Sequence, residues 1–515
     1  MKKSNKGEGN LLLNIIKIVI FLVLISIQLY FAFILLGETA DFAKYSSFAF
    51  DIIKLCAVLY IIYKNQNPAY KIAWIVLIMF FPIPGILLYI LLGNTKLSKS
   101  MQKKINNIDK KTEVLLSDKP FDEIKEIDKL RYNQMQYIYK TTGYPVLKNS
   151  SVKYFKLGEE YFEEMLKDIE KAEKYILIEY FIISQSTMWN RLFEVLKKKV
   201  SNNVKVYIMT DEIGSIFKLP KHFRKKLKEA GIEYSIFNPI SPIISSYINY
   251  RDHRKITVID GKVAYTGGIN IGDEYINVSH KLGHWKDTGV RVTGEAVWSY
   301  TVMFLRMWDL SKTKQELDYK YFMNNKEEKY NYDKGYVMPY CDGPNNQNNP
   351  AENTYINMIN TAKNYIYITT PYLIVDNETV NSLVNSAKSG VDVRIITPYI
   401  PDKTFVHLTT RSFYQVLLEA GVKIYEYKPG FIHSKTFVID DELAIVGTIN
   451  LDFRSLYLHY ECGLLMYKTG EEIIIKNDFL ETEEKCIQIN LDTWKKRGFM
   501  KKILEALLKA FAPMM

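Results

Sequence analysis

The sequence predicts an α/β protein made of two tandem copies of one domain, packed about a pseudo-twofold axis and preceded by apolar N-terminal helices. From about residue 145, short β-rich runs alternate with amphipathic helical segments, a pattern typical of α/β folds. The same series of segments then occurs a second time. Long uncharged apolar runs are concentrated in the first hundred positions.

Two of these apolar runs are long enough to cross a membrane. Residues 18–37 form a run of 20 and residues 72–95 a run of 24, each sufficient for a hydrocarbon core of roughly 30 Å. Between them, residues 45–63 are apolar but carry Asp51 and Lys54, which favours an interfacial or re-entrant helix over a span. A kink or break is expected in the second run at Pro82, Pro84 and Gly85.

A cleaved signal peptide is disfavoured because the first run is too long and no small-residue cleavage site follows it. Basic residues flank the apolar region on both sides, so two spans would leave both flanks in the cytoplasm, whereas three would not. We therefore expect a multi-pass membrane protein with its soluble part on the cytoplasmic face, and the sequence leaves two or three spans open.

The chain of 515 residues carries a net charge of +11, which favours anionic partners such as nucleic acid or anionic lipid headgroups. Its four cysteines form no C-x-x-C pair and no zinc-type cluster with histidine, so we expect neither a disulfide framework nor a structural metal.

The duplication is visible as three pairs of matching segments, with offsets between 187 and 190 residues. The pairs are 172–181 with 362–372, 204–211 with 391–398, and 230–234 with 420–425. Turn-forming residues at 341–349 mark the expected boundary. The predicted organisation is a membrane region at 1–95, a linker at 96–144, a first catalytic half at 145–340, a second at 350–490 and a basic amphipathic helix at 491–515.

Two related strings stand at matching places in the halves. Each has a histidine, a lysine two residues later and an aspartate five residues after that, followed by small residues and an asparagine. Alternating β-branched residues indicate strands that turn at the aspartate and return toward the histidine. The members are His253, Lys255, Asp260, Gly267, Gly268 and Asn270, and His433, Lys435, Asp440, Gly447, Thr448 and Asn450.

This set of side chains suits a phosphodiester substrate. One neutral imidazole can attack phosphorus, while a second, protonated imidazole gives a proton to the leaving alkoxide. Lysines and asparagines can bind the phosphate oxygens, here Asn270 and Asn450. Carboxylates are needed to orient the imidazoles, and Glu461 and Asp287 are the candidates.

A single histidine on a strand is usually structural, but two copies of the whole pattern argue against that interpretation. Asp260 and Asp440 are different, because their turn positions indicate a structural task at least as strongly as a chemical one. The remaining histidines have no duplicated context, apart from the nearness of His459 to Glu461, and are interpreted as structural: His222, His280, His284, His407 and His459.

The paired H-x-K-x4-D strings resemble the signature of the phospholipase D superfamily, and the chain from about residue 65 resembles bacterial cardiolipin synthases. Supporting stretches are 67–74, 82–89, 270–275, 284–287 and 431–435. The resemblance implies phospholipase D-like domains and a bacterial cell membrane location. It also implies transfer between two phosphatidylglycerols without a metal or cofactor. It makes His253 the nucleophile and His433 the acid–base group, with the two roles exchangeable, and places Asp260 and Asp440 in the active-site set.

Two residues depart from the family pattern, since Thr448 replaces the usual serine and His459 stands where asparagine is common.

Alternatives to a cardiolipin synthase are a membrane-bound phospholipase D-type hydrolase, a nuclease, or an inactive scaffold that binds anionic lipid. The membrane region and the basic, apolar stretch 494–511 favour phospholipids, namely phosphatidylglycerol and cardiolipin, over nucleic acid. Acyl-chain preference, physiological donor and oligomeric state are left open.

Overall fold

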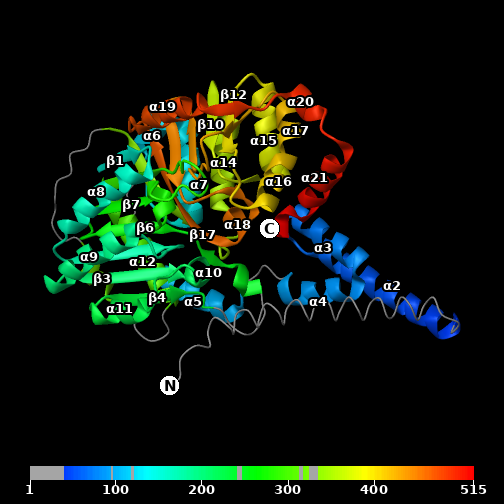
Figure 1. The fold of residues 1–515 in the computed structure, drawn as a ribbon, viewed down its shortest axis with the longest axis horizontal. Coiled ribbons are helices and arrows are strands. Elements are labelled where there is room, and N and C mark those ends of the chain that lie inside the picture. Colours follow the sequence, from blue (N-terminus) through cyan, green and yellow to red (C-terminus); the bar gives the residue numbers. More distant parts are fainter. Residues whose placement is uncertain are drawn as a thin grey trace. The chain divides into compact units, whose positions relative to one another are not determined.

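The computed structural model describes residues 40–93, 97–116, 121–239, 246–311, 317–323 and 334–514 (Figure 1). The chain divides into two compact units. The described part of the first unit contains three N-terminal helices, and the second unit contains both halves of the duplicated region.

The first unit is built from α2 (Ala40–Tyr63), α3 (Pro68–Phe80) and α4 (Pro82–Leu92). Helices α3 and α4 approach closely where a Cβ atom on Gly85 would lie 2.9 Å from the Cα atom of Ile78. Glycine is therefore the residue that permits this contact. A small core joins the helices through Ile61, Trp74, Ile78 and Tyr89.

The break expected at Pro82 in the apolar run 72–95 is confirmed, whereas the expected membrane crossing by this run is not supported. The run is divided into α3 and α4, of 13 and 11 residues, because Phe81 leaves the helical conformation and Pro82 starts a new helix. Residues 45–63, in contrast, belong to the continuous helix α2. Among the described residues, no helix has both the length and the apolar character that a membrane crossing requires. The run at 18–37 lies outside the described residues.

The first half of the second unit contains a seven-stranded mixed sheet with the order β1-β8-β7-β6-β2-β3-β4. The interior strand β2 is buried on both faces, as its mostly apolar sequence predicts, and its one charged residue, Glu179, is buried as well. The strands are β1 (Ser150–Phe155), β2 (Tyr175–Tyr180), β3 (Lys205–Asp211), β4 (Glu233–Phe237), β6 (Lys255–Ile259), β7 (Val263–Gly267) and β8 (Gly289–Gly294).

The second half repeats this topology in a nine-stranded sheet. Its equivalent order is β9-β17-β15-β14-β10-β12-β13, with β18 and β5 as additions. The predicted tandem duplication is confirmed. The strands are β9 (Tyr336–Asp342), β10 (Tyr365–Thr369), β12 (Asp392–Pro398), β13 (Lys423–Tyr427), β14 (Thr436–Ile439), β15 (Leu443–Gly447), β17 (His459–Tyr467), β18 (Cys486–Gln488) and β5 (Arg251–Asp252).

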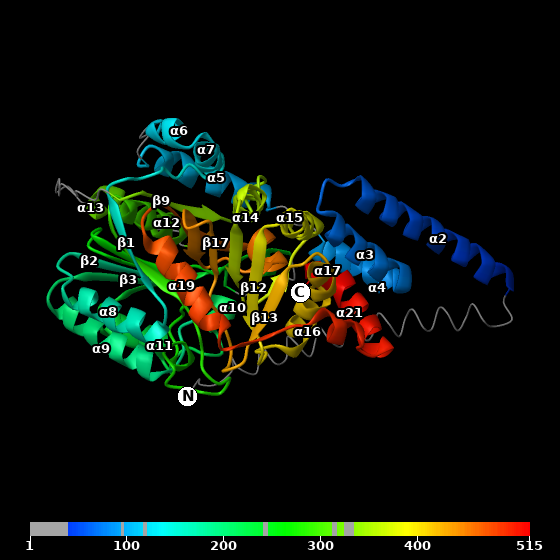
Figure 2. The same ribbon diagram turned by 90° about the horizontal axis from the view of Figure 1, so that it is seen from above.

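Helices cover both faces of the first sheet (Figure 2). The amphipathic helices α8 (Gly158–Glu170) and α9 (Thr187–Ser201) share one apolar core with the sheet. Helix α12 (Ala296–Ser311) packs against β2, β4, β6, β7 and β8 and also contacts β9 of the other half. In the second half, α19 (Glu471–Glu483) follows the equivalent strand, packs on its own sheet and contacts β1. The remaining helices around this sheet include α14 (Pro350–Thr361), α15 (Asn377–Lys388), α16 (Thr404–Ser412) and α17 (Tyr414–Glu419).

Tight turns join β6 to β7 and β14 to β15, as predicted. Asp260 and Gly261 have positive φ angles of 53° and 66°, and Asp440 and Asp441 have 54° and 59°. Two successive positive φ values match the twist of a two-residue hairpin.

Residues 96–144, expected as a linker, contain folded helices in their described part. These are α5 (Lys99–Glu113), α6 (Glu123–Ile127) and α7 (Lys129–Thr142), which contact α12, α14 and β9. The second sheet begins with β9 at Tyr336, which the sequence assigned to the first half. At the other end of the chain, α20 (Leu491–Lys495) precedes α21 (Phe499–Phe511), where the amphipathic helix was predicted.

Candidate active site

His253 lies between β5 and β6, at the place where the two halves meet. Strand β5 pairs with β17, and the His253 amide donates a hydrogen bond to the Tyr460 carbonyl at 2.9 Å. The ring Nδ1 lies 2.8 Å and 3.1 Å from the two carboxylate oxygens of Glu461. A residue of the second half therefore orients the imidazole of the first.

His433 has the reciprocal arrangement. Its amide donates to the Lys286 carbonyl at 2.7 Å, and its Nδ1 lies 2.6 Å from Oδ2 of Asp287. The two candidate carboxylates thus contact the two histidines, and each pair crosses between the halves. Both imidazoles are 7% exposed and both carboxylates are fully buried, so solvent competes little for these bonds.

The lysines of the two strings lie under the imidazoles. Nζ of Lys255 donates to the His253 carbonyl at 2.5 Å, and Nζ of Lys435 donates to the His433 carbonyl. Each ammonium also interacts electrostatically with both Asp287 and Glu461. The structure therefore gathers the histidines and lysines of both strings into one buried cluster.

Burial sets the protonation of this cluster. It lowers the pKa of His253 to about 3 and that of His433 to about 4, so both rings are neutral near pH 7. Burial also lowers the pKa of Lys255 to about 8 and that of Lys435 to about 7. Burial alone would raise the pKa of Glu461, but the neighbouring His253 overrides it and holds that carboxyl well below its usual range.

The two candidate phosphate-binding asparagines differ in their present bonds. Asn270 accepts from the Ile182 amide at 3.1 Å and donates to the Tyr275 hydroxyl at 2.8 Å. The amide oxygen of Asn450 is buried and has no hydrogen-bond partner among the described residues. Asn450 therefore has unused bonding capacity, whereas Asn270 is partly committed to the fold.

The structure does not bring the two motif aspartates to the imidazoles. Asp260 follows β6 and His253 precedes it, so they are separated by roughly 20 Å along the strand. The Asp260 carboxylate accepts hydrogen bonds from three backbone amides at the start of β2, at 2.7, 2.8 and 2.8 Å. Asp440 does the same before β10, at 2.7, 2.8 and 3.0 Å. These contacts are those of structural residues.

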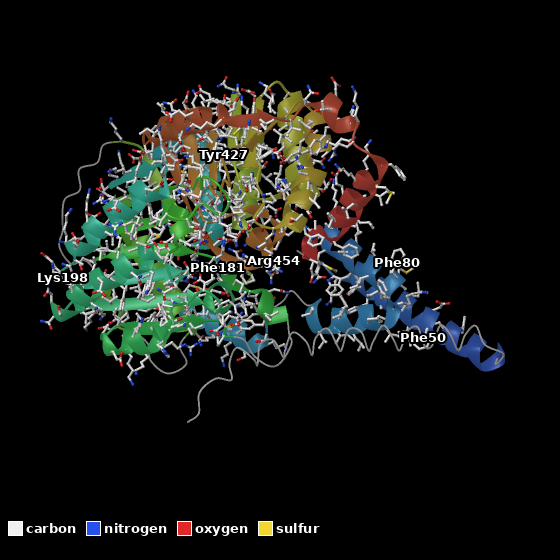
Figure 3. All side chains as sticks on the ribbon, in the orientation of Figure 1. Phe50, Phe80, Phe181, Lys198, Tyr427 and Arg454 are labelled. Atoms are coloured by element: carbon white, nitrogen blue, oxygen red, sulfur yellow. The ribbon has the colours of Figure 1, made fainter. Side chains whose placement is uncertain are left out.

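Among the residues that line the imidazoles, Thr448 was placed in the second string and His459 was interpreted as structural, but sequence reasoning missed the contacts of Trp285 and Phe181. The Thr448 hydroxyl donates to Glu461 at 2.5 Å. The ring centroid of His459 lies 5.5 Å from that of His253, and Trp285 lies 5.4 Å from His433. Phe181, labelled in Figure 3, lies 4.9 Å from His253.

The alternation of side chains along an extended strand could have identified two of these rings, those of His459 and Trp285. His459 stands two residues before Glu461, and Trp285 two residues before Asp287. In extended backbone, residues at i and i+2 face the same side.

Comparison with known proteins identifies the family. The family described as "Cardiolipin synthase, PLD-like domain" matches residues 165–308 and 355–481, and "Phospholipase_D-nuclease N-terminal" matches residues 50–94. An uncharacterised protein of Streptococcus mutans is 42% identical over 89% of this chain and 99% of its own length. Cardiolipin synthases of Geobacillus kaustophilus and Alkalihalophilus pseudofirmus are 34% and 32% identical, over 90% and 91% of this chain and 94% and 93% of their own lengths.

A solved structure supports the fold. The crystal structure of phosphatidylserine synthase from Haemophilus influenzae aligns with a TM-score of 0.56 and 14% identity, over 75% of this chain and 98% of that one. Duplicated sheets, paired histidine strings and these sequence matches agree: the chain belongs to the cardiolipin synthase family of the phospholipase D superfamily.

Proposed function

We propose that this protein is a cardiolipin synthase, which transfers a phosphatidyl group from one phosphatidylglycerol to another and releases glycerol. One observation carries the proposal: two buried imidazoles in one cluster, each oriented by a carboxylate from the opposite half. Family membership supports the same activity, because curated relatives that match nearly their whole length bear this name.

In the first step, Nε2 of His253 attacks the phosphorus of phosphatidylglycerol. Glu461 accepts a hydrogen bond from the Nδ1–H group of His253. The ring proton therefore stays on Nδ1, and the lone pair that attacks phosphorus is on Nε2. The bond from phosphorus to the glycerol headgroup breaks, and a protonated His433 gives the leaving oxygen its proton. The anionic substrate favours the protonated form of His433, because an opposite charge raises the pKa of an imidazole.

In the second step, His433 accepts a proton from the headgroup hydroxyl of a second phosphatidylglycerol. That oxygen attacks phosphorus, and the bond to His253 breaks. Cardiolipin is released, both imidazoles return to their starting state, and the net products are cardiolipin and glycerol. Lys255 and Lys435 contribute positive charge to the phosphate oxygens, and Asn450 offers an additional polar group.

The assignment of His253 as the nucleophile is supported by the surroundings of Glu461. A phosphorylated imidazole carries positive charge, which an ionised carboxylate stabilises. Glu461 bonds to His253 and also accepts the Thr448 hydroxyl, and its pKa lies well below the usual range because of His253.

We also propose that the protein acts at the bacterial cell membrane, with the catalytic unit on the cytoplasmic face. Exposed apolar side chains on the N-terminal helices support attachment to lipid, since Phe48 is 67% and Tyr63 88% exposed. Phe80, labelled in Figure 3, is 73% exposed. On α21, Phe499 and Met500 are each 74% exposed beside basic residues. The crossing at 18–37 and the number of crossings stay predictions, tested by alkaline carbonate extraction and protease protection.

The deciding experiment supplies purified full-length protein with labelled phosphatidylglycerol and separates the products. Cardiolipin with an equal amount of glycerol supports the synthase. Phosphatidic acid without cardiolipin would identify a hydrolase of the phospholipase D type. Absence of turnover in protein with an intact fold would identify a lipid-binding scaffold.

A further inference from the structure

The two halves differ at the ring that lies beside each catalytic imidazole. In the first half Trp285, two residues before Asp287, lies against His433; in the second half His459, two residues before Glu461, lies against His253. An indole cannot ligate a metal ion, whereas an imidazole can. Only one of these two equivalent positions therefore adds a metal ligand to its catalytic pair.

His459 has bonding capacity that the fold does not use. Its side chain is 11% exposed, and neither ring nitrogen has a hydrogen-bond partner among the described residues. Nδ1 lies 3.7 Å from Oε1 of Glu461, beyond hydrogen-bonding distance. A buried polar ring without a partner is costly unless something binds it.

Three potential ligands converge at this position. His253, His459 and Glu461 each offer one ligand atom, and these atoms all lie within 4.8 Å of one another. A tetrahedral ion with bonds of about 2.1 Å holds its ligands roughly 3.4 Å apart, so small side-chain rotations close the site. Thr448 holds the Glu461 carboxylate from behind, as outer residues commonly do in metal sites.

We propose that His253, His459 and Glu461 form an inhibitory site for Zn²⁺ or a similar imidazole-binding cation. Two imidazoles and one carboxylate, with a fourth position left for water or a phosphate oxygen, are a ligand set that Zn²⁺ accepts. The positive charges of Lys255 and Lys435 repel any cation that is held by electrostatic attraction alone. Mg²⁺ and Ca²⁺, which require oxygen ligands, therefore do not compete with Zn²⁺ for this site.

Binding would stop the proposed transfer reaction through either nitrogen of His253. Coordination by Nε2 occupies the atom that attacks phosphorus. Coordination by Nδ1 requires the ring proton to sit on Nε2, which removes the attacking lone pair. No bond to carbon or phosphorus changes in either case, so a chelator restores the enzyme.

The test uses Co²⁺ as a spectroscopic probe on the full-length protein without any lipid substrate. One Co²⁺ per chain should bind with the visible absorption of a four- or five-coordinate ion, and Zn²⁺ should displace it. His459→Asn should weaken Co²⁺ binding at least about tenfold. The matched control is His222→Asn, which changes an exposed histidine with a φ of 59° that asparagine tolerates.

A second variant, His459→Trp, introduces the residue that the first half has at this place and should also lose the ion. In a parallel activity assay, the turnover of each variant is expressed relative to its own rate without metal. The Zn²⁺ concentration that halves this turnover should be at least about tenfold higher in both His459 variants than in the parent protein. Unchanged Co²⁺ affinity in folded His459→Asn and His459→Trp, or no bound Co²⁺ in the parent protein, would overturn the proposal. Because Co²⁺ binding needs no lipid, these results are independent of whether the protein makes cardiolipin.

Discussion

The two halves of the catalytic unit share a topology but differ in the residues that surround their imidazoles. The carboxylate at His253 is Glu461, which also accepts a hydrogen bond from the Thr448 hydroxyl. The carboxylate at His433 is Asp287. Gly268 stands in the place of Thr448, and a Cβ atom there would lie 2.1 Å from the Asp287 carboxylate. The symmetric fold thus supports two chemically different histidines, as the proposed division into a nucleophile and an acid–base group requires.

The largest expected effect comes from removing either imidazole. His253→Ala and His433→Ala should each reduce cardiolipin formation by a factor of about 10³ or more, because each removes a group that bonds to or protonates a reacting atom. Acid-quenched reactions with labelled lipid separate the roles: His433→Ala should retain some phosphohistidine, and His253→Ala should form none. Full turnover in either variant, with circular dichroism unchanged, would end the paired-imidazole mechanism.

Removing a carboxylate should have the next largest effect. Glu461→Gln and Asp287→Asn should each lower kcat by about 10²-fold or more, since an amide no longer stabilises a charged imidazole in the correct orientation. Glu461→Gln should slow formation of the phosphoenzyme, and Asp287→Asn should slow its transfer to the second lipid. Rapid-quench kinetics distinguish the two steps. If each change slowed the step assigned to the other, the nucleophile would have to be reassigned to His433.

The lysines predict an alkaline limit to activity. Burial lowers the pKa of Lys435 to about 7 and that of Lys255 to about 8, so their charge is present at lower pH and is lost as pH rises through these values. The kcat/KM should therefore fall about tenfold per pH unit between pH 7 and 8, and up to about a hundredfold per pH unit above pH 8, where both charges are lost. Lys435→Arg should move this fall to higher pH in the remaining activity, because arginine stays charged. Lys198→Arg on the exposed face of α9 is the control and should leave the profile unchanged (Figure 3).

A smaller effect on kcat is expected at Thr448, whose equivalent in the first half is Gly268. Thr448→Val keeps the shape but removes the hydroxyl that donates to Glu461, which should cost about 1 kcal/mol, or roughly fivefold in kcat. Thr448→Ser retains the donor and should stay close to the parent rate. Equal rates for the valine and serine variants would show that the hydroxyl does not contribute.

The smallest effect on turnover is expected at the motif aspartates. Asp260→Ala should lower the free energy of unfolding by about 2–3 kcal/mol, because three backbone amides lose their acceptor. Asp440→Ala should cost less, since its amide partners are more exposed. Denaturant titration measures stability, and turnover per folded molecule should fall far less than in the histidine variants. A loss as large as that of His433→Ala would return these aspartates to the catalytic group.

The sequence was sufficient to predict the duplication, the hairpins and the histidine strings, because these depend on local patterns that are repeated. It also identified Glu461 and Asp287, but it could not show that each carboxylate serves the opposite half. That pairing depends on the contact of β5 with β17 and on the bridge from Lys286 to Ile432, which only tertiary packing determines.

Two other sequence-based expectations had identifiable limits. The sequence pattern predicts a structural role for His459, because the equivalent position in the first half, 285, is a tryptophan and not a second histidine. The apolar run 72–95 satisfied the length criterion for a membrane crossing, although its prolines correctly predicted the break that divides it into two helices at Phe81 and Pro82. Hydropathy counts residues and does not register where the backbone hydrogen bonds of a helix are interrupted.

The exchange of carboxylates between the halves bears on how such an enzyme could arise. A single ancestral copy would have held its histidine without an orienting carboxylate, so it could have worked only as a self-associated pair of chains. Fusion of two copies made that association permanent and freed each copy to change alone. The two equivalent positions differ, with tryptophan at 285 and histidine at 459, as independent change after fusion would produce.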